Sequence, residues 1–442
     1  MIKLKHVVFS AIVFASFNSF AITRIDINRG TVDPIPIAIP DFTADTSHER
    51  VIGRQMAEVI ANDLESSGLF RPISADAFIE DIKDGKNSTP NFASWRQIKA
   101  TALSVGAINI RGKELEVNFR LWDVYAGTQI AGRAYGTVEA NWRRISHMIA
   151  DEIYKKLTGE DGYFDTRLVY VSESGPFQNR VKRLAVMDFD GANHKFLTNG
   201  KSMALTPRFS PAAHQILYMS YAGKVPKVYI RDIETGRERL LGNFPGMSFA
   251  PRFSPDGRSV VMSIARNGVT HIHRMELDSG TMNQLTSGNA INTSPSFTPD
   301  GNSIIFNSDR SGKPQLYKMS AYGGEAQRIS FGNGRYATPV VSPRGDFVAF
   351  TKWADGSGLF SIGVMKLDGS GERIISRGYL VEGPTWSPNG RVIIYTKQDK
   401  PYGTNKPAPS RLYSIDLTGH NEREIVTPTD ASDPAWSGLL SD

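Results

Sequence analysis

The chain has 442 residues, of which 40% are hydrophobic and 22% charged, and its formal net charge is +6. This length allows two or three domains with sizeable cores, whereas no run of lysines or arginines is long enough to follow a nucleic-acid backbone. Because the chain contains no cysteine, disulfide scaffolds, thiolate metal sites and cysteine nucleophiles are excluded.

The first 21 residues are typical of a secretory signal peptide. Lys3 and Lys5 give a basic start, residues 7–17 form an apolar stretch, and Ser19 and Ala21 supply the small residues of a cleavage site. The alternative is an uncleaved membrane anchor, but the apolar run is too short to span a bilayer. We therefore expect cleavage after Ala21, export, and no insertion of the mature chain into a membrane.

Residues 22–34 form a separate N-terminal segment. Its first part alternates apolar and polar residues like a β-strand, yet no partner strand is evident in the sequence. Such a segment can pair with another chain by β-augmentation. The alternative is an ordinary edge strand or a frayed terminus.

Residues 35–160 have the pattern of a small α/β domain. A capping box at Thr46 and Glu49 begins a helix that stops at Gly68, and Gly159 ends another helix. The predicted elements are a strand over 35–41, helices over 46–67, from Ser94 and over 141–157, and strands over 107–111, 115–123 and 129–138.

From about residue 166 the chain repeats a motif with the consensus Pro-x-[Phe/Trp]-Ser-Pro-Asp-Gly. The first proline of each copy recurs roughly every 44 residues, and the six copies begin at Pro207, Pro251, Pro295, Pro339, Pro384 and Pro434. The Asp-Gly or Asn-Gly pair predicts a tight turn, and β-rich segments follow it. Four short strands per repeat are typical of one blade of a β-propeller.

The two ends of this region together complete one further blade. The copy at Pro434 supplies a single strand before the chain ends, and residues 167–171, 184–188 and 195–197 supply three strands at the other end. Pairing them leaves no open edge. The sequence therefore predicts a multidomain protein, with a small N-terminal α/β domain followed by a six-bladed β-propeller over 166–442 that is closed by a split blade. An open β-solenoid would not need the split unit.

Several motifs resemble catalytic or metal sites but are better explained by structure. Ser248 stands in a Gly-x-Ser-x-Ala sequence between strands and not in a strand–turn–helix. Residues 199–202 lack the first glycine of a phosphate loop. His273 occupies a slot that carries tyrosine in other repeats, beside His271, and residues 188–193 form a turn that requires Asp-Gly anyway. We expect no catalytic residue, no metal and no cofactor.

The segments before each anchor proline are the remaining candidate surface. We expect them to be loops that converge on the mouth of the central channel, and they mix Met, Phe, Tyr and Ile with a few polar residues, as protein interfaces do. The alternative is that they only close turns. These segments are residues 203–206, 246–250, 291–294, 334–338, 380–383 and 430–433.

The order of modules, the stretch Leu121-Trp-Asp-Val124 and the terminal Pro434-Ala-Trp-Ser437 carry a family resemblance. The chain resembles the TolB family, the periplasmic β-propeller components of the Tol–Pal system. The resemblance implies a non-catalytic, monomeric periplasmic scaffold that supports outer-membrane integrity and invagination during cell division. The implied partners are the lipoprotein Pal, TolA and other outer-membrane proteins, with no nucleic acid.

The resemblance also implies where these partners bind. It places the Pal-binding face of the propeller at Met247, Ser248, Phe249, Ala250, Asn292, Thr293, Tyr336 and Glu382. It places TolA binding at Ile22, Thr23, Arg24, Ile25, Asp26, Ile27 and Asn28. In this scheme the N-terminal segment either docks on the body or is released to TolA, and Pal binding shifts the balance.

Two other classes of protein use propellers. An exported peptidase or hydrolase would need an added catalytic domain, and residues 22–160 show no credible Ser–His–Asp arrangement. A sugar-binding or lyase propeller would need acidic or histidine clusters at the channel mouth. The candidates for such a cluster, Glu382, Asp430 and Asp433, form no motif.

Overall fold

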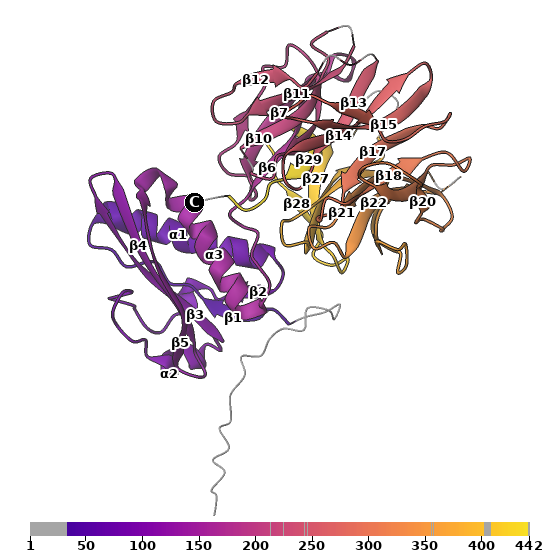
Figure 1. Cartoon of the computed structure of the whole chain (residues 1–442). Coiled ribbons are helices and arrows are strands. Elements are labelled where there is room, and N and C mark those ends of the chain that lie inside the picture. Colours follow the sequence, from indigo (N-terminus) through magenta and orange to yellow (C-terminus); the bar gives the residue numbers. More distant parts are fainter. Residues whose placement is uncertain are drawn as a thin grey trace, which may run out of the picture.

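The computed structural model describes residues 33–440 except 213, 224, 243, 245, 355, 357 and 402–407. The predicted signal peptide, its cleavage site at Ala21 and residues 22–32 of the N-terminal segment lie outside the described residues. The described part forms a small α/β domain followed by a six-bladed β-propeller (Figure 1). The predicted fold class is therefore confirmed.

The N-terminal domain is built on a five-stranded sheet with the strand order β2-β1-β3-β4-β5. β1 pairs in parallel with β2 and β3, while β3, β4 and β5 are antiparallel. The strands are β1 (Ile35–Ala38), β2 (Phe70–Pro72), β3 (Ala102–Arg111), β4 (Glu114–Asp123) and β5 (Thr128–Val138). The sequence pattern missed β2, because three residues carry too little periodicity, and it started β3 too late.

Two helices, α1 (Ser47–Ser66) and α3 (Trp142–Thr158), pack against each other and against this sheet (Figure 1). The predicted capping box begins α1: Glu49 N donates to the Thr46 hydroxyl at 3.2 Å, and Thr46 N donates to the Glu49 carboxylate at 2.9 Å. Gly159 ends α3 with a φ of +80°, a conformation that glycine adopts without strain.

The short helix α2 (Phe92–Gln97) begins two residues before Ser94, where the sequence placed its start, because the Asn91 side chain caps it. Single turns of 3-10 helix complete the helical elements of the described chain, namely η1 (Ala75–Ala77), η2 (Glu139–Asn141) and η3 (Phe177–Asn179).

Each propeller blade is an antiparallel sheet of four strands, and the first strand of each group below is the innermost. Blades 1 to 3 are β9 (Ala204–Phe209), β10 (Gln215–Ser220), β11 (Lys227–Asp232), β12 (Glu238–Leu240); β13 (Met247–Phe253), β14 (Ser259–Arg266), β15 (Val269–Glu276), β16 (Met282–Gln284); and β17 (Asn292–Phe297), β18 (Ser303–Ser308), β19 (Gln315–Ser320), β20 (Gln327–Arg328).

Blades 4 and 5 follow the same plan, and blade 6 is the predicted split blade. They are β21 (Arg335–Val341), β22 (Phe347–Trp353), β23 (Phe360–Lys366), β24 (Arg373–Gly378); β25 (Leu380–Trp386), β26 (Val392–Gln398), β27 (Ser410–Asp416), β28 (Arg423–Ile425); and β29 (Asp430–Trp436), β6 (Arg167–Ser174), β7 (Val181–Asp188), β8 (Lys195–Phe196). β29 pairs antiparallel with β6, with Trp436 opposite Leu168, so that the last strand closes the ring.

The expected loops before the anchor prolines are in fact parts of the innermost strands. Each innermost strand shifts register at this point, and the residue before the proline has a positive φ. The shift is a β-bulge, which the sequence pattern did not reveal because most of these residues are not glycine. The residues are Thr206, Ala250, Ser294, Thr338, Gly383 and Asp433, with φ between +45° and +66°.

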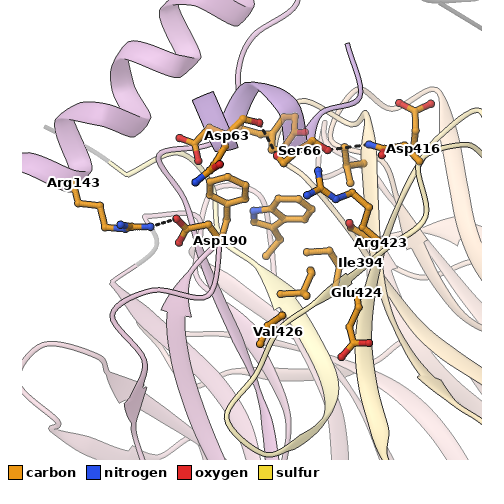
Figure 2. Close-up of a pocket in the computed structure, with 17 residues that line it drawn as sticks. Asp63, Ser66, Arg143, Asp190, Ile394, Asp416, Arg423, Glu424 and Val426 are labelled. Carbon is orange, nitrogen blue, oxygen red and sulfur yellow. Dashed lines mark hydrogen bonds and ion pairs between the residues drawn. The ribbon is translucent and has the colours of Figure 1, made fainter. Parts of the chain in front are cut away.

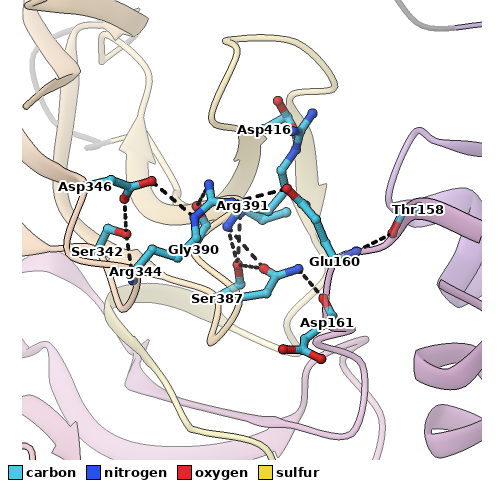
Figure 3. Close-up of polar contacts among 12 residues, drawn as sticks. Thr158, Glu160, Asp161, Ser342, Arg344, Asp346, Ser387, Gly390, Arg391 and Asp416 are labelled. Atoms are coloured by element: carbon cyan, nitrogen blue, oxygen red, sulfur yellow. Dashed lines mark hydrogen bonds and ion pairs between the residues drawn. The ribbon is translucent and has the colours of Figure 1, made fainter. Parts of the chain in front are cut away.

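The tight turns of the repeat lie at one face of the ring, which we call the turn face, and the N-terminal domain covers part of it. Arg344 and Asn389, from the turns of blades 4 and 5, bind the chain just after α3 (Figure 3). Arg344 Nη1 lies 3.2 Å from Glu160 Oε1, and Asn389 Nδ2 donates to the carbonyl oxygen of Asp161 at 2.7 Å.

The two domains also share a hydrophobic core. Tyr163 and Phe164, in the link between the domains, are buried against Trp436 of β29 and residues of α3. The Trp436 indole Nε1 donates to the Thr166 hydroxyl at 2.8 Å, which fixes the ring in the junction. Apolar burial therefore joins the N-terminal domain to the split blade.

Candidate functional site

The face of the ring opposite the turn face, which we call the mouth face, surrounds one end of the central channel. It is formed where the innermost strands begin and where the second strand of each blade connects to the third. In β9 and β10, for example, Ser220 at the end of the second strand lies opposite Ala204 at the start of the first. The N-terminal domain packs at the other end of the blades, so it leaves this face uncovered.

Five of the eight residues predicted to bind Pal have solvent-accessible surface at this face. Met247, the first residue of β13, is 37% exposed, and Glu382 in β25 is also exposed. Phe249, Ala250 and Thr293 are half-buried. Four of them lie on β13 and β17 of the neighbouring blades 2 and 3, whereas Glu382 lies on β25 of blade 5, elsewhere on the same rim of the channel.

Ser248, Asn292 and Tyr336 are instead buried and support the rim from below. The Asn292 amide donates to the carbonyl oxygen of Thr270 at 2.9 Å and accepts from Arg310 at 2.8 Å. The Tyr336 hydroxyl donates to the Glu372 carboxylate at 2.7 Å. Asn292 thus holds neighbouring backbone, and none of the three side chains is part of the accessible surface.

A set of exposed apolar side chains completes the mouth face. Met203, Met247 and Ile291 belong to segments that the sequence singled out, whereas the others lie in connections that were not considered. The side chains and their exposed fractions are Met203 41%, Tyr221 43%, Val225 42%, Met247 37%, Ile291 47%, Phe331 70%, Leu359 47% and Tyr379 40%. The signal that could have identified them is a large apolar residue within an otherwise polar or glycine-rich connection.

Acidic groups gather on the side of the channel formed by blades 5 and 6. Although Glu382 is exposed at the rim, the surrounding protein partly desolvates its carboxylate and raises its pKa, and the nearby Asp433 carboxylate adds to this effect. Glu173 of β6 is held by Lys182 at 3.0 Å and by Arg180 at 3.3 Å. Desolvation raises the pKa of Glu173, but the hydrogen bond from Ser432 and the charge of Lys182 outweigh it, and its pKa is lowered.

A pocket of about 320 Å³ lies between the domains, between the end of α1, the start of α3 and blades 5 and 6 (Figure 2). Ile394, Val426 and Trp436 contribute apolar surface to it, and Arg143 and Arg423 contribute positive charge. Arg143 forms an ion pair with Asp190, as Figure 2 shows, and Asn421 donates to the carbonyl oxygen of Ser66 at 2.9 Å.

Asp63, His147 and Asp190 form a compact cluster beside this pocket, with donor atoms within 4.8 Å of one another. Asp63 Oδ2 lies 2.7 Å from His147 Nδ1, and both side chains are almost fully buried. Burial on its own lowers the pKa of His147, but the charge and hydrogen bond of Asp63 raise it to about 9. A protonated His147 and Arg143 balance the two carboxylates, so the cluster serves as an ion-pair network between the domains.

The motifs that the sequence set aside have structural roles in the described chain. His273 Nδ1 lies 3.1 Å from the carbonyl oxygen of His271 within β15. The turn at 188–193 is held by Asn193, whose amide donates to Asp188 at 2.6 Å, and its Asp190 reaches the N-terminal domain. The sequence identified this turn but not its contact across the domain boundary.

None of the helices in the described part of the chain is long and apolar enough to cross a membrane. Family models match both parts of the chain: the TolB amino-terminal domain over residues 23–130 and the TolB beta propeller domain over residues 154–440. Together they cover nearly all of the sequence after the predicted signal peptide.

Relatives of known family extend this match to the full length. The chain is 53% identical over 446 aligned positions to the Tol-Pal system protein TolB of Rickettsia prowazekii, which covers 99% of this chain and 100% of the relative. It is 55% identical over 434 positions to that of Rickettsia massiliae, which covers 96% and 97%.

A solved structure shows the same arrangement of domains. The crystal structure of TolB from Acinetobacter baumannii superposes with a TM-score of 0.78 at 26% identity, covering 92% of this chain and 97% of the other. The order of domains, the ring closure and the full-length identity agree with one another. The chain belongs to the TolB family, whose members are non-catalytic proteins of the Tol–Pal system.

Proposed function

We propose that this protein is a periplasmic scaffold that binds the lipoprotein Pal through the mouth face and TolA through residues 22–34. In this role it supports outer-membrane integrity and invagination during cell division, and it acts as a monomer after removal of residues 1–21. The observation that carries the proposal is the row of exposed apolar side chains on the one face of the ring that the N-terminal domain leaves open. Large exposed apolar patches mark sites of protein association.

The mouth face has the composition of an interface. Tyr221, Phe331 and Tyr379 are aromatic side chains that add much contact area at low entropic cost, and Met247 can adapt its shape to a partner. The buried side chains of Asn292 and Tyr336 hold the strands beneath these exposed residues, so the surface is already formed before a partner binds.

Titration of purified Pal against two matched variants tests this assignment. Met247 is 37% exposed on the mouth face, and Leu240 is 36% exposed on the outermost strand of blade 1. We expect Met247→Asp to weaken Pal binding about tenfold or more, because a buried charge is costly at an interface. Leu240→Asp should bind Pal like the parent protein. Equal affinity of both variants would place Pal elsewhere.

The proposed TolA segment is tested by deletion of residues 22–28. We expect the shortened protein to lose TolA binding and to keep Pal binding, because the two surfaces are separate in the chain. Loss of both activities would contradict the division of roles. Size-exclusion chromatography with light scattering on the same samples tests the proposed monomer.

The proposed coupling between the two partners has a physical place to act. The interdomain pocket offers apolar walls at Ile394, Val426 and Trp436, and Ile25 and Ile27 of the N-terminal segment alternate at strand spacing. We propose that residues 22–34 dock in this pocket when they are not bound to TolA. Pal binding then changes the fraction of molecules in which the segment is docked.

Cross-linking measures this docked fraction directly, because the natural chain contains no cysteine. An Ile25→Cys/Val426→Cys variant should cross-link, and the yield should change when Pal is added. The Ile25→Cys/Leu240→Cys variant is the control, since Leu240 is exposed on the outermost strand of blade 1 and does not line the pocket. A yield unaffected by Pal would refute the coupling.

A further inference from the structure

Two arginines interrupt a hydrogen-bonding pattern that joins neighbouring blades around the channel. The residue after each anchor proline lies on an innermost strand, and in blades 3 and 5 it carries a hydroxyl. The Ser296 hydroxyl accepts from the backbone N–H of Val341 in the next blade at 3.2 Å. The Thr385 hydroxyl accepts from the N–H of Trp436 at 3.3 Å.

These N–H groups need an acceptor from outside their own sheet. In antiparallel pairs, hydrogen-bonded and non-hydrogen-bonded positions alternate. Ser342 N bonds to Phe347 O within blade 4, so the adjacent residue Val341 directs its N–H away from β22. The hydroxyl of the preceding blade supplies the acceptor at this position.

Blades 1 and 2 carry Arg208 and Arg252 at the same position of the repeat. The facing strands have the same register: Ser254 N bonds to Ser259 O, and Thr298 N bonds to Ser303 O. The N–H groups of Phe253 and Phe297 therefore point out of their own ladders in the same way. The arginine side chain has hydrogen-bond donors and no acceptor. At both blade junctions an arginine therefore faces a backbone N–H that it cannot bond. Blades 4 and 6 carry Val340 and Ala435 there, which bring no charge.

The two guanidinium groups also lack counter-charges. No described carboxylate lies within ion-pair distance of either one, and Arg208 contacts only the carbonyl oxygen of Pro207 at 2.6 Å. β9 and β13 are neighbours in the ring. Burial lowers the pKa of both arginines, Arg208 lowers that of Arg252 further, and the Asp433 charge acts in the opposite direction on Arg208 alone.

We propose that Arg208 and Arg252, with the N–H groups of Phe253 and Phe297, form an anion-binding site in the wall of the channel. The ligand is a single oxyanion, either a carboxylate or an inorganic sulfate or phosphate. The planar guanidinium fork matches the two oxygens of such a group. The anion supplies the acceptor that Ser296 and Thr385 supply elsewhere, and it neutralises the paired positive charges.

Thermal unfolding of the mature chain in sodium sulfate, against sodium chloride at equal ionic strength, tests the site. Arg252→Ser places at this position the residue that blade 3 has at Ser296. The new serine hydroxyl can therefore accept from the facing backbone N–H of Phe297. Arg239→Ser is the control, because Arg239 is exposed on β12, the outermost strand of blade 1, away from the channel. We expect sulfate to raise the melting temperature of the parent and of Arg239→Ser by a few degrees, and to raise that of Arg252→Ser only by the smaller, site-independent effect that sulfate has on folded proteins.

The same sulfate shift in all three proteins would overturn the proposal. In chloride, Arg252→Ser should melt above the parent, because it removes a charge without a counter-ion. Arg252→Lys keeps the charge without the fork and should show a reduced sulfate shift. If Arg252→Ser does not fold, the Arg252→Lys variant decides the question. A sulfate-induced rise in its melting temperature equal to that of the parent would refute a site that depends on the guanidinium fork.

A second measurement distinguishes a free anion from an acidic side chain of the partner, and this part rests on the proposed function. If the anion is a partner carboxylate, sulfate should weaken Pal binding to the parent several-fold and leave binding to Arg252→Ser unaffected. If it is a free anion, Pal affinity should not depend on sulfate while the thermal shift persists. Absence of both effects refutes the site.

Discussion

The turn face and the mouth face of the propeller are made by the same repeat, yet they differ in every physical respect. On the turn face, Pro-Asp-Gly turns are closed by short side-chain hydrogen bonds, such as that between Ser254 and Asp256 at 2.5 Å, and polar groups meet the N-terminal domain. On the mouth face, the positions vary among blades and large apolar side chains stand in solvent. The regular part of the repeat builds the scaffold, and its variable part forms the surface that we propose for recognition.

The largest loss of stability is expected from a substitution at the junction between the turn face and the N-terminal domain. Trp436 is 8% exposed and packs against Tyr163 with ring centroids 5.7 Å apart. Trp436→Ala should lower the free energy of unfolding by about 3–5 kcal/mol. Urea unfolding followed by fluorescence measures this loss. A loss below about 1 kcal/mol would mean that the junction does not hold the ring.

A buried ion pair on the same side gives the next largest effect. Arg391 Nε lies 2.5 Å from Asp416 Oδ2, and both side chains are 8% exposed (Figure 3). Arg391→Met leaves Asp416 buried without its main counter-charge and should cost about 3 kcal/mol. The double variant Arg391→Met/Asp416→Leu should cost less than the single one. Additive losses in this comparison would show that the pair is not coupled.

The interdomain network predicts a pH dependence that the mouth face does not share. The pKa of His147 is raised above its unfolded value to about 9 by Asp63, so its contribution is complete below about pH 6.5 and is lost as pH rises towards 9. The free energy of unfolding should therefore fall over this window, by on the order of 2 kcal/mol. His147→Asn should flatten the dependence, and an unchanged slope would contradict the assignment.

The smallest effect on folding is expected at the mouth face. Phe331 is 70% exposed, so Phe331→Ser should change the free energy of unfolding by no more than about 0.5 kcal/mol. The same variant should bind Pal more weakly than the parent. A large loss of stability would show that this residue belongs to the scaffold, and the contrast between the faces would be weaker than we describe.

Much of the fold could be predicted from the sequence because the anchor prolines and Asp-Gly turns have one physical meaning. They gave the number of blades, and the incomplete last copy gave the ring closure. The same reasoning placed the capping box of Thr46 and Glu49 and the end of α3 at Gly159.

The candidate surface was harder to predict, because a bulge changes which side chains face outwards. Thr206, Ala250 and Ser294 have positive φ although they are not glycine, and nothing in their identity signals this. Asn292 and Tyr336 therefore seemed to belong to the surface, whereas they are buried. The pairing of Asp190 with Arg143 depends on how two domains meet, which local patterns do not encode.

The split blade ties the timing of folding to the last strand of the propeller. β6 has no inner neighbour until β29 pairs with it, with Trp436 opposite Leu168. A chain delivered N-terminus first, by a ribosome or through a translocation channel, therefore cannot close its ring until β29 has been delivered. Truncated products keep an open sheet edge, which makes them recognisable to proteases and holding chaperones as incomplete.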